Sequence, residues 1–240
     1  MFIEWVIKIT VNISDLRTKI DIIDQEIIRL LLKRVDVVHE VGSIKNTTQS
    51  RVYVPEREAL IFNKLSELSG LTPKDVQSFY TEIISFCRKF ESTLNVACIK
   101  DANSLLALKK IFGEFVNPIY FSNLNKFINI DSNINYVIVE FSKTLIDALK
   151  TSKWFIINTI YIDNQQLFLL SKFPNEIKTG KDISYFFSSS SINDSSLKVD
   201  ENLFLSEIEV FSTKENYKSI FEDLFNKIEL TYIGSSPIIK

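Results

Sequence analysis

The sequence is poor in the residues that metal sites, disulfides and glycine-rich phosphate loops require. Its 240 residues include two cysteines, one histidine and five glycines. Cys87 and Cys98 lie in different predicted elements without a CxxC spacing, and with His39 they form no recognisable set of metal ligands. No GxGxxG or P-loop pattern occurs. We therefore expect neither a metal site nor a phosphate loop of this kind.

No charge of one sign predominates either. The chain has 28 basic and 30 acidic residues, mixed along its length, for a net charge of −2. This balance gives no field that would attract nucleic acid or an anionic membrane, so any bound anion must be held locally. Residues 1–12 are rather apolar but too short for a membrane span or a secretion signal. We expect a cytoplasmic protein that binds neither nucleic acid nor membrane.

What the sequence does have is a long helical pattern from Ser14, a good N-cap, to Lys45. At roughly 1.5 Å per residue this helix is about 45 Å long, more than the few helices of one small domain can cover. Its apolar residues recur at alternating steps of four and three, which keeps one stripe facing a partner helix. The pattern therefore predicts an intertwined dimer. The stripe consists of Leu16, Ile20, Ile23, Ile27, Leu30, Val37, Val41 and Ile44.

Arg34 fills the one gap in that stripe. A guanidinium in a helix seam is costly unless an anionic group meets it. Lys45 follows at a spacing that places it about 20° away around the helix, so the two cations share a face. Arg17 lies roughly 25 Å away along the axis and on another side, so in a dimer it would serve the partner's site. Arg34 is therefore the first functional candidate.

A second helix is predicted over residues 55–70, opening on a proline and ending on a glycine. Arg57 and Glu58 lie near its N-terminus, where backbone N–H groups also favour an anion. Glu56 is expected to be a solvated carboxylate of the first turn. Two or more fixed cations and a carboxylate in an apolar bundle predict a pocket for a small dianion that bears hydroxyl groups.

The rest of the chain shows two kinds of pattern. A third helix, announced by Thr72 and Pro73, runs to about Glu91 and completes an all-helical first domain. After residue 94, short apolar runs separated by helical pieces predict an α/β or α+β second half. The predicted strands are 95–99, 118–121, 136–141, 154–161, 167–170, 203–211 and 228–233, the predicted helices are 104–112, 145–150 and 217–227, and serine-rich loops are predicted at 188–191 and 195–196.

Four stretches of the first domain resemble the all-helical class of chorismate mutases in order, spacing and residue type. They are Leu16-Arg17-x-x-Ile20-Asp21-x-x-Asp24, Leu31-x-x-Arg34, Val41-Gly42-x-x-Lys45 and Pro55-Glu56-Arg57-Glu58. The resemblance covers about residues 14–92. It implies a three-helix, all-α mutase domain that forms an intertwined homodimer with shared active sites, acting in the biosynthesis of phenylalanine and tyrosine.

The same resemblance implies a role for each candidate residue. Arg34, Arg57 and the partner subunit's Arg17 would hold the carboxylates of chorismate. Lys45 would contact the ether oxygen, and Glu58 would bind the ring hydroxyl. The implied conversion to prephenate is a rearrangement within one molecule, so we expect no nucleophile, metal or cofactor. The protein must hold the compact diaxial conformer and stabilise the charge that develops on the breaking ether.

Three positions depart from the family's pattern. Cys87 and Glu91 stand where serine and glutamine usually occur late in the third helix, and Val54 stands where some members carry aspartate. We keep Cys87 and Val54 as candidate substrate-binding residues. Glu91 would have to be protonated to donate a hydrogen bond to the ether oxygen. We therefore expect Lys45, Glu91 and Arg34 to be catalytic, and activity to fall as the pH rises above neutrality.

The second half resembles proteobacterial P-proteins, in which a mutase is fused to prephenate dehydratase and an ACT domain. The resemblance rests on residues 79–113 and on the ending Ile233-Gly234-Ser235-Ser236-Pro237. The dehydratase signatures are degraded, because Gly-Pro-x-Gly-Thr-Phe reads as residues 100–105 (KDANSL), Glu-Asn-Ser as 140–142 (EFS) and Thr-Arg-Phe as 166–168 (QLF). We expect an N-terminal extension at 1–13, a mutase domain at 14–94, an inactive dehydratase-like region at 95–175 and an ACT-like remnant at 176–240.

Two other functions stay open beside a chorismate mutase. A bifunctional enzyme that retains dehydration would need substitutes for the missing threonine and arginine. A noncatalytic helical dimer that regulates or scaffolds another shikimate enzyme is disfavoured, because the costly charges of the seam are all kept. A pyruvate lyase on the same helical fold is a minor further alternative.

Overall fold

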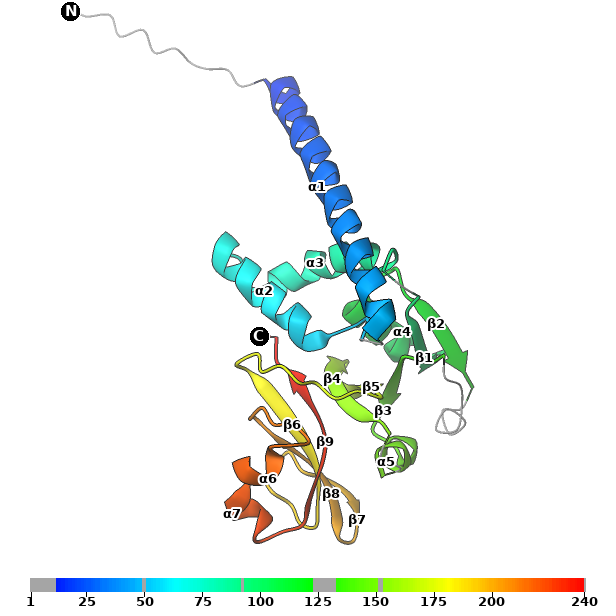
Figure 1. Ribbon diagram of the computed structural model, residues 1–240, viewed down its shortest axis with the longest axis vertical. Coiled ribbons are helices and arrows are strands. Elements are labelled where there is room, and N and C mark those ends of the chain that lie inside the picture. Colours follow the sequence, from blue (N-terminus) through cyan, green and yellow to red (C-terminus); the bar gives the residue numbers. More distant parts are fainter. Residues whose placement is uncertain (1–11, 49–50, 92, 123–132, 151–152, 240) are drawn as a thin grey trace, which may run out of the picture.

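The computed structural model describes residues 12–48, 51–91, 93–122, 133–150 and 153–239. Three helices, α1 to α3, lie at one end of the molecule, and a mixed sheet with four further helices lies at the other (Figure 1). This matches the predicted class, an all-helical domain followed by a reduced α/β to α+β domain. Most of the predicted N-terminal extension falls outside the described residues. No helix in the described ranges is long and apolar enough to cross a membrane.

Helix α1 (Ile13–Thr48) projects away from the rest of the chain as a long rod (Figure 1). It begins one residue earlier than predicted, because the Asn12 side chain, not that of Ser14, caps it by accepting the Ser14 N–H at 3.1 Å. It also continues three residues beyond Lys45. All eight residues of the apolar stripe are exposed within one chain, from Val41 at 40% to Ile44 at 65%.

Helices α2 (Pro55–Ser69) and α3 (Pro73–Arg88) pack side by side on Phe62, Val76 and Ile84. Their ends follow local signals that were readable in the sequence. Gly70 ends α2 in the left-handed region at φ 74°, and Thr72 forms a reciprocal capping box with the third residue of α3. Helix α3 ends at Arg88, earlier than predicted, and a turn leads from there to Glu91.

Nine strands of the described chain form one sheet in the order β2-β1-β3-β5-β4-β9-β6-β8-β7. The first three strands are parallel, β5 runs antiparallel to β3 and β4, and β9 runs parallel to β4 but antiparallel to β6. The strands are β1 (Asn95–Ile99), β2 (Asn117–Phe121), β3 (Tyr136–Glu140), β4 (Phe155–Ile162), β5 (Gln165–Ser171), β6 (Asp182–Ser188), β7 (Leu197–Asp200), β8 (Leu203–Ile208) and β9 (Leu230–Pro237).

Helices α4 (Ala102–Phe112) and α5 (Lys143–Lys150) bury alternate residues of the central strands. Val96 and Cys98 of β1 belong to the core that α4 covers, whereas Ala97 belongs to the core that includes α5. Because side chains alternate along a strand, the two helices lie on opposite faces of the sheet. Tyr53, from the segment before α2, is buried in the α4 core. The first domain therefore reaches into the second half at this point.

Two strands were missed by the sequence pattern, β6 and β7. The serine-rich stretch that was predicted as a loop begins with Ser188, which is the last residue of β6. The helix predicted at 217–227 is two short helices, α6 (Tyr217–Ile220) and α7 (Glu222–Phe225). The last strand, β9, lies at 230–237 instead of 228–233. The sheet is continuous across residue 175, where the sequence analysis divided a dehydratase-like region from an ACT-like remnant. That division stays a prediction.

The contact between β4 and β9 joins the two parts of this sheet and depends on a glycine. Gly234 pairs with Ile156 and has a φ of +148°. A Cβ at this position would lie 2.0 Å from the Ile156 carbonyl oxygen. The two strands can approach each other here only because residue 234 has no side chain.

Candidate functional site

The C-terminal part of α1 approaches the end of α3 at Gly42. This glycine is buried, and a Cβ there would lie 2.8 Å from the Glu91 carbonyl oxygen. One turn later, Lys45 Nζ lies 2.6 Å from Glu91 Oε1, in an ion pair whose side chains are 26% and 10% exposed. The glycine of the Val-Gly-x-x-Lys motif therefore lets the helix come close enough for its lysine to reach Glu91.

Arg34 lies on the same helix, three turns before Lys45. Its guanidinium carbon lies 5.8 Å from the centroid of the aromatic ring of Tyr80, which belongs to α3. Its Nη1 atom is buried and has no hydrogen-bond partner among the residues that the structure describes. Burying a guanidinium nitrogen without an acceptor is costly, so this atom marks a place where an external acceptor would bind favourably.

Glu58, in the first turn of α2, is buried and forms an ion pair with Arg88 of α3. Burial raises the pKa of the Glu58 carboxyl above its ordinary value of 4.5, while the charges of Arg88 and Arg34 oppose this shift and that of Glu91 adds to it. Charges from α1, from α3 and from the turn after α3 therefore act on this carboxyl group of α2. Arg34, Lys45, Glu58, Arg88 and Glu91 form one polar cluster, which we call the three-helix cluster.

Arg88 is the member of this cluster that the sequence analysis missed. Its guanidinium is buried, stacks 5.3 Å from the centroid of the Tyr53 ring, and donates a hydrogen bond of 3.5 Å to the Phe112 carbonyl of α4. The sequence offered only a weak signal for it, a basic residue in the last turn of a helix. Lysine and arginine are common there for their interaction with the helix dipole, so the position alone does not indicate a functional residue. Arg88 connects Glu58 to the second half of the protein.

The other predicted site residues are placed differently. Cys87 is buried in α3 one turn before Glu91, and Val54 is partly buried directly before Pro55. Arg57 and Arg17 are exposed within the single chain. Arg17 lies near the N-terminal end of α1, more than four turns before Arg34 of the three-helix cluster. One chain therefore brings together Arg34, Lys45, Glu58 and Glu91, but neither Arg57 nor Arg17 contributes to that cluster.

The expectation for Glu56 was wrong. This carboxylate is 1% exposed and is paired with Arg51, whose side chain is 12% exposed. Helix N-termini usually present their first-turn carboxylates to water, which is why the sequence suggested a solvated group. The second half of the chain covers this turn of α2, and nothing in the local pattern indicates that.

The three-helix cluster suits a small anion with hydroxyl groups. Two guanidinium groups and one ammonium face two carboxylates, which leaves one positive charge in excess. Lys45 and Arg34 can donate to carboxylate or ether oxygens, and Glu58 can accept from a hydroxyl. Within the described residues no group of three or more His, Cys, Asp or Glu side chains could hold a metal ion. A cleft of about 730 Å³ between α2, α3, α4 and β4 adjoins the cluster, with Glu58 in its lining.

Comparison with known proteins finds a family match over the residues that contain this cluster. Residues 16–92 match the family described as chorismate mutase type II. The bifunctional chorismate mutase/prephenate dehydratase of Aquifex aeolicus (strain VF5) is 38% identical over 92 residues, covering 36% of this chain and 25% of that protein. The protein of the same description from Neisseria gonorrhoeae (strain ATCC 700825 / FA 1090) is 36% identical over 83 residues, covering 34% and 22%.

These similarities concern only part of each protein. The chain spans about a quarter of the length of the curated relatives it matches. A solved structure, the X-ray structure of prephenate dehydratase from Streptococcus mutans, aligns with 61% of this chain and 99% of its own, at 13% identity and a TM-score of 0.45. That score is too low to establish a shared fold.

Proposed function

We propose that this chain is a chorismate mutase that converts chorismate to prephenate. The observation that carries the proposal is the buried, unpartnered Nη1 of Arg34, which lies in one cluster with the Lys45–Glu91 pair and Glu58. A dianionic substrate would supply the missing acceptor. The match of residues 16–92 to the chorismate mutase family supports the same reaction.

The proposed mechanism uses fixed charges and no cofactor. Arg34 binds a substrate carboxylate. Glu58, held by Arg88, accepts a hydrogen bond from the ring hydroxyl. Lys45 turns from Glu91 to the ether oxygen, where negative charge develops as the bond breaks. Glu91, in its acid form, donates a second hydrogen bond to that oxygen. Preorganised donors in a site closed to water lower the barrier without needing a chemical group from the protein.

The proposed active form is a homodimer with shared sites. The exposed stripe of α1, including Ile20, Ile23 and Ile27, each more than half exposed, supports this assembly, because a single soluble chain would leave such a rod uncovered. An antiparallel partner helix would bring its own Arg17 toward the three-helix cluster. We propose that this arginine binds the second substrate carboxylate, with Arg57 contributing from α2.

We further infer that the second half no longer dehydrates prephenate. Leu167 stands where the dehydratase signature has its arginine, and it is 1% exposed in the core around β5. Gln166 stands where the threonine would be, and its amide donates to Glu207 at 2.7 Å. An apolar core residue cannot supply the cation that would act on prephenate. The strands and short helices after residue 175 are proposed to be an ACT-like remnant.

One assay tests both parts of this proposal. Purified protein given chorismate should form prephenate well above the uncatalysed rate, and the same protein given prephenate should form no phenylpyruvate above background. Products are identified by chromatography at matched times. Absence of chorismate turnover would refute the mutase function and favour a noncatalytic dimer. Phenylpyruvate formed from prephenate would instead establish the bifunctional alternative.

The pH profile of kcat/KM is expected to have an acid limb that depends on Glu58. Burial raises the pKa of Glu58 above 4.5, so its carboxylate is lost as the pH falls through that raised value, and activity falls with it. Rates are measured from roughly pH 4 to 9. Glu58→Gln should remove the acid limb; an acid limb that persists in this variant would contradict the assignment.

A further inference from the structure

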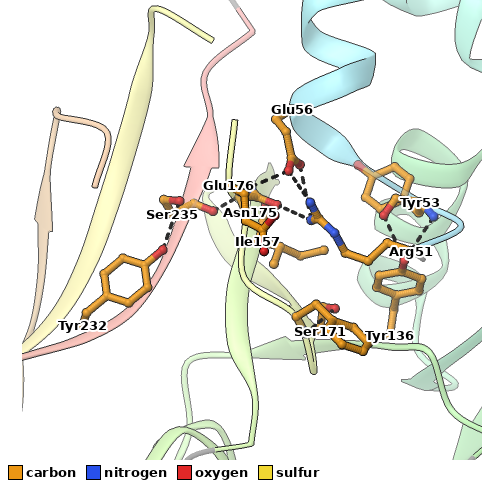
Figure 2. Close-up of polar contacts among 11 residues, drawn as sticks. Arg51, Tyr53, Glu56, Tyr136, Ile157, Ser171, Asn175, Glu176, Tyr232 and Ser235 are labelled. Carbon is orange, nitrogen blue, oxygen red and sulfur yellow. Dashed lines mark hydrogen bonds and ion pairs between the residues drawn. The ribbon is translucent and has the colours of Figure 1, made fainter. Parts of the chain in front are cut away.

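The segment that leads into α2 is held in the second half of the chain by a buried ion pair. Arg51 and Glu56 are 12% and 1% exposed. Figure 2 shows the Arg51 guanidinium between the Glu56 carboxylate and the side chain of Asn175, to whose Oδ1 it donates at 2.9 Å. The backbone N–H of Glu176 donates to Glu56 Oε1 at 3.3 Å. The carboxylate is thus bound from both halves of the protein.

Asn175 connects this pair to the junction of the sheet. Its Nδ2 donates to the Ile157 carbonyl of β4 and to the Ser235 carbonyl of β9, each at 2.8 Å (Figure 2). The side chain is buried, so its oxygen and both of its N–H groups are used inside the protein. The position of Arg51 is therefore fixed relative to β4 and β9, the two strands that join the parts of the sheet.

Tyr53 fixes the same segment from its other side. The Tyr136 hydroxyl of β3 donates to the Tyr53 carbonyl at 2.9 Å and accepts the Tyr53 N–H at 3.1 Å. The Tyr53 hydroxyl accepts from Asn158 of β4 at 2.9 Å. Backbone and side chain of one residue are thus bound to two strands, which leaves the segment little freedom to move independently of the sheet.

This attachment matters for the proposed mutase site because Glu58 follows two residues after Glu56, in the same turn of α2. The N-cap residue of α2, Val54, makes no side-chain capping bond, so the orientation of this turn depends on other contacts. A buried ion pair contributes less to stability than its contacts suggest, because desolvation opposes the attraction, but it is sensitive to geometry. We propose that Arg51, Glu56 and Asn175 are positioning residues: through them the second half holds the first turn of α2 where Glu58 can meet the substrate.

This inference rests on the proposed mutase function and gives the degraded second half a role in it. Lys45 and Glu91 come from α1 and from the turn after α3, so loosening α2 displaces Glu58 and Arg57 but leaves the groups at the ether oxygen in place. Substrate binding should suffer more than the chemical step. A purely structural role would instead lower the fraction of folded enzyme, and would reduce apparent kcat without changing KM.

The test uses the full-length chain with Glu56→Gln and Asn175→Leu. Each is expected to raise KM for chorismate roughly three- to tenfold, with kcat within about twofold of wild type. Exposed residues provide matched controls: Glu67→Gln on α2 and Asn226→Leu in the second half should leave both constants unchanged. Hydrogen exchange of the peptide spanning residues 54–62, measured without substrate, should be faster in both test variants than in the controls.

The outcomes separate this inference from the proposed function. An unchanged KM in both test variants, or a fall in kcat alone, would overturn the positioning role while leaving the mutase function intact. A wild-type chain without mutase activity would refute the proposed function, and unchanged hydrogen exchange in the 54–62 peptide would then refute the inference as well. Raised KM together with faster exchange would establish the positioning role.

Discussion

Arg34→Ala should lower kcat/KM for chorismate roughly a thousandfold, which corresponds to about 4 kcal/mol of lost transition-state stabilisation. The physical reason is the buried Nη1 of Arg34, which has no acceptor among the described residues and is free to bind the substrate. Removing the guanidinium leaves a substrate carboxylate desolvated without its cation. Arg34→Lys keeps the charge but loses the planar fork, so it should recover only part of the activity. Steady-state kinetics of the purified variants measure both effects.

Arg29→Ala is the matched control for this experiment. Arg29 lies on the same helix, five residues earlier, and forms an exposed i,i+3 pair with Glu26. Its removal should leave kcat/KM close to that of wild type, because an exposed pair of this kind is strongly screened by water. If Arg34→Ala were as active as Arg29→Ala, the unpartnered nitrogen would be a packing feature and the proposed site would lose its main support.

The sequence predicted the helical domain well because its signals are local. Pro55 starts α2, Gly70 ends it, and Thr72 with Asp75 caps α3, each through contacts within a few residues. The shared face of Arg34 and Lys45 was predictable because the spacing of cations along α1 fixes their positions around the helix. Such periodicity holds whatever packs against the helix, which is why Arg34 and Lys45 could be identified without a structure.

What the sequence did not predict depends on contacts between distant residues. Arg88 pairs with Glu58 across two helices, and Glu56 is buried because Asn175 and Glu176 approach it from the second half. Strand β6 was missed because its last residue, Ser188, was placed in a serine-rich loop and the aromatic run at 185–187 was not recognised as a strand. In the sheet, serine hydroxyls bond one another across strands, as Ser188 and Ser206 do at 2.8 Å. Only the assembled fold satisfies these polar groups, so local composition could not reveal them.

A mixture of two inactive variants, Arg17→Ala and Arg34→Ala, is expected to regain activity when the chains are unfolded together and refolded. In the proposed dimer each site takes Arg34 from one chain and Arg17 from the other. A heterodimer then has one intact site and one doubly altered site. Random pairing makes half of the dimers heterodimers, so the mixture should reach about a quarter of wild-type activity. Activity is measured at equal total protein before and after mixing, with dimer content checked by light scattering.

A second mixture shows why this recovery would be specific to shared sites. Arg34 and Lys45 lie on one face of the same helix, so Arg34→Ala mixed with Lys45→Ala leaves every site with one defect and should recover nothing. If the Arg17 mixture also stayed inactive while heterodimers formed, Arg17 would act within its own chain or not at all. The exposed stripe of α1 could then still form a dimer, but Arg17 would not complete the partner's site. Recovery in the first mixture alone would mean that each active site combines residues of two chains. Arg17 at the exposed end of α1 in one chain would then act together with Arg34 and Lys45 of the other chain.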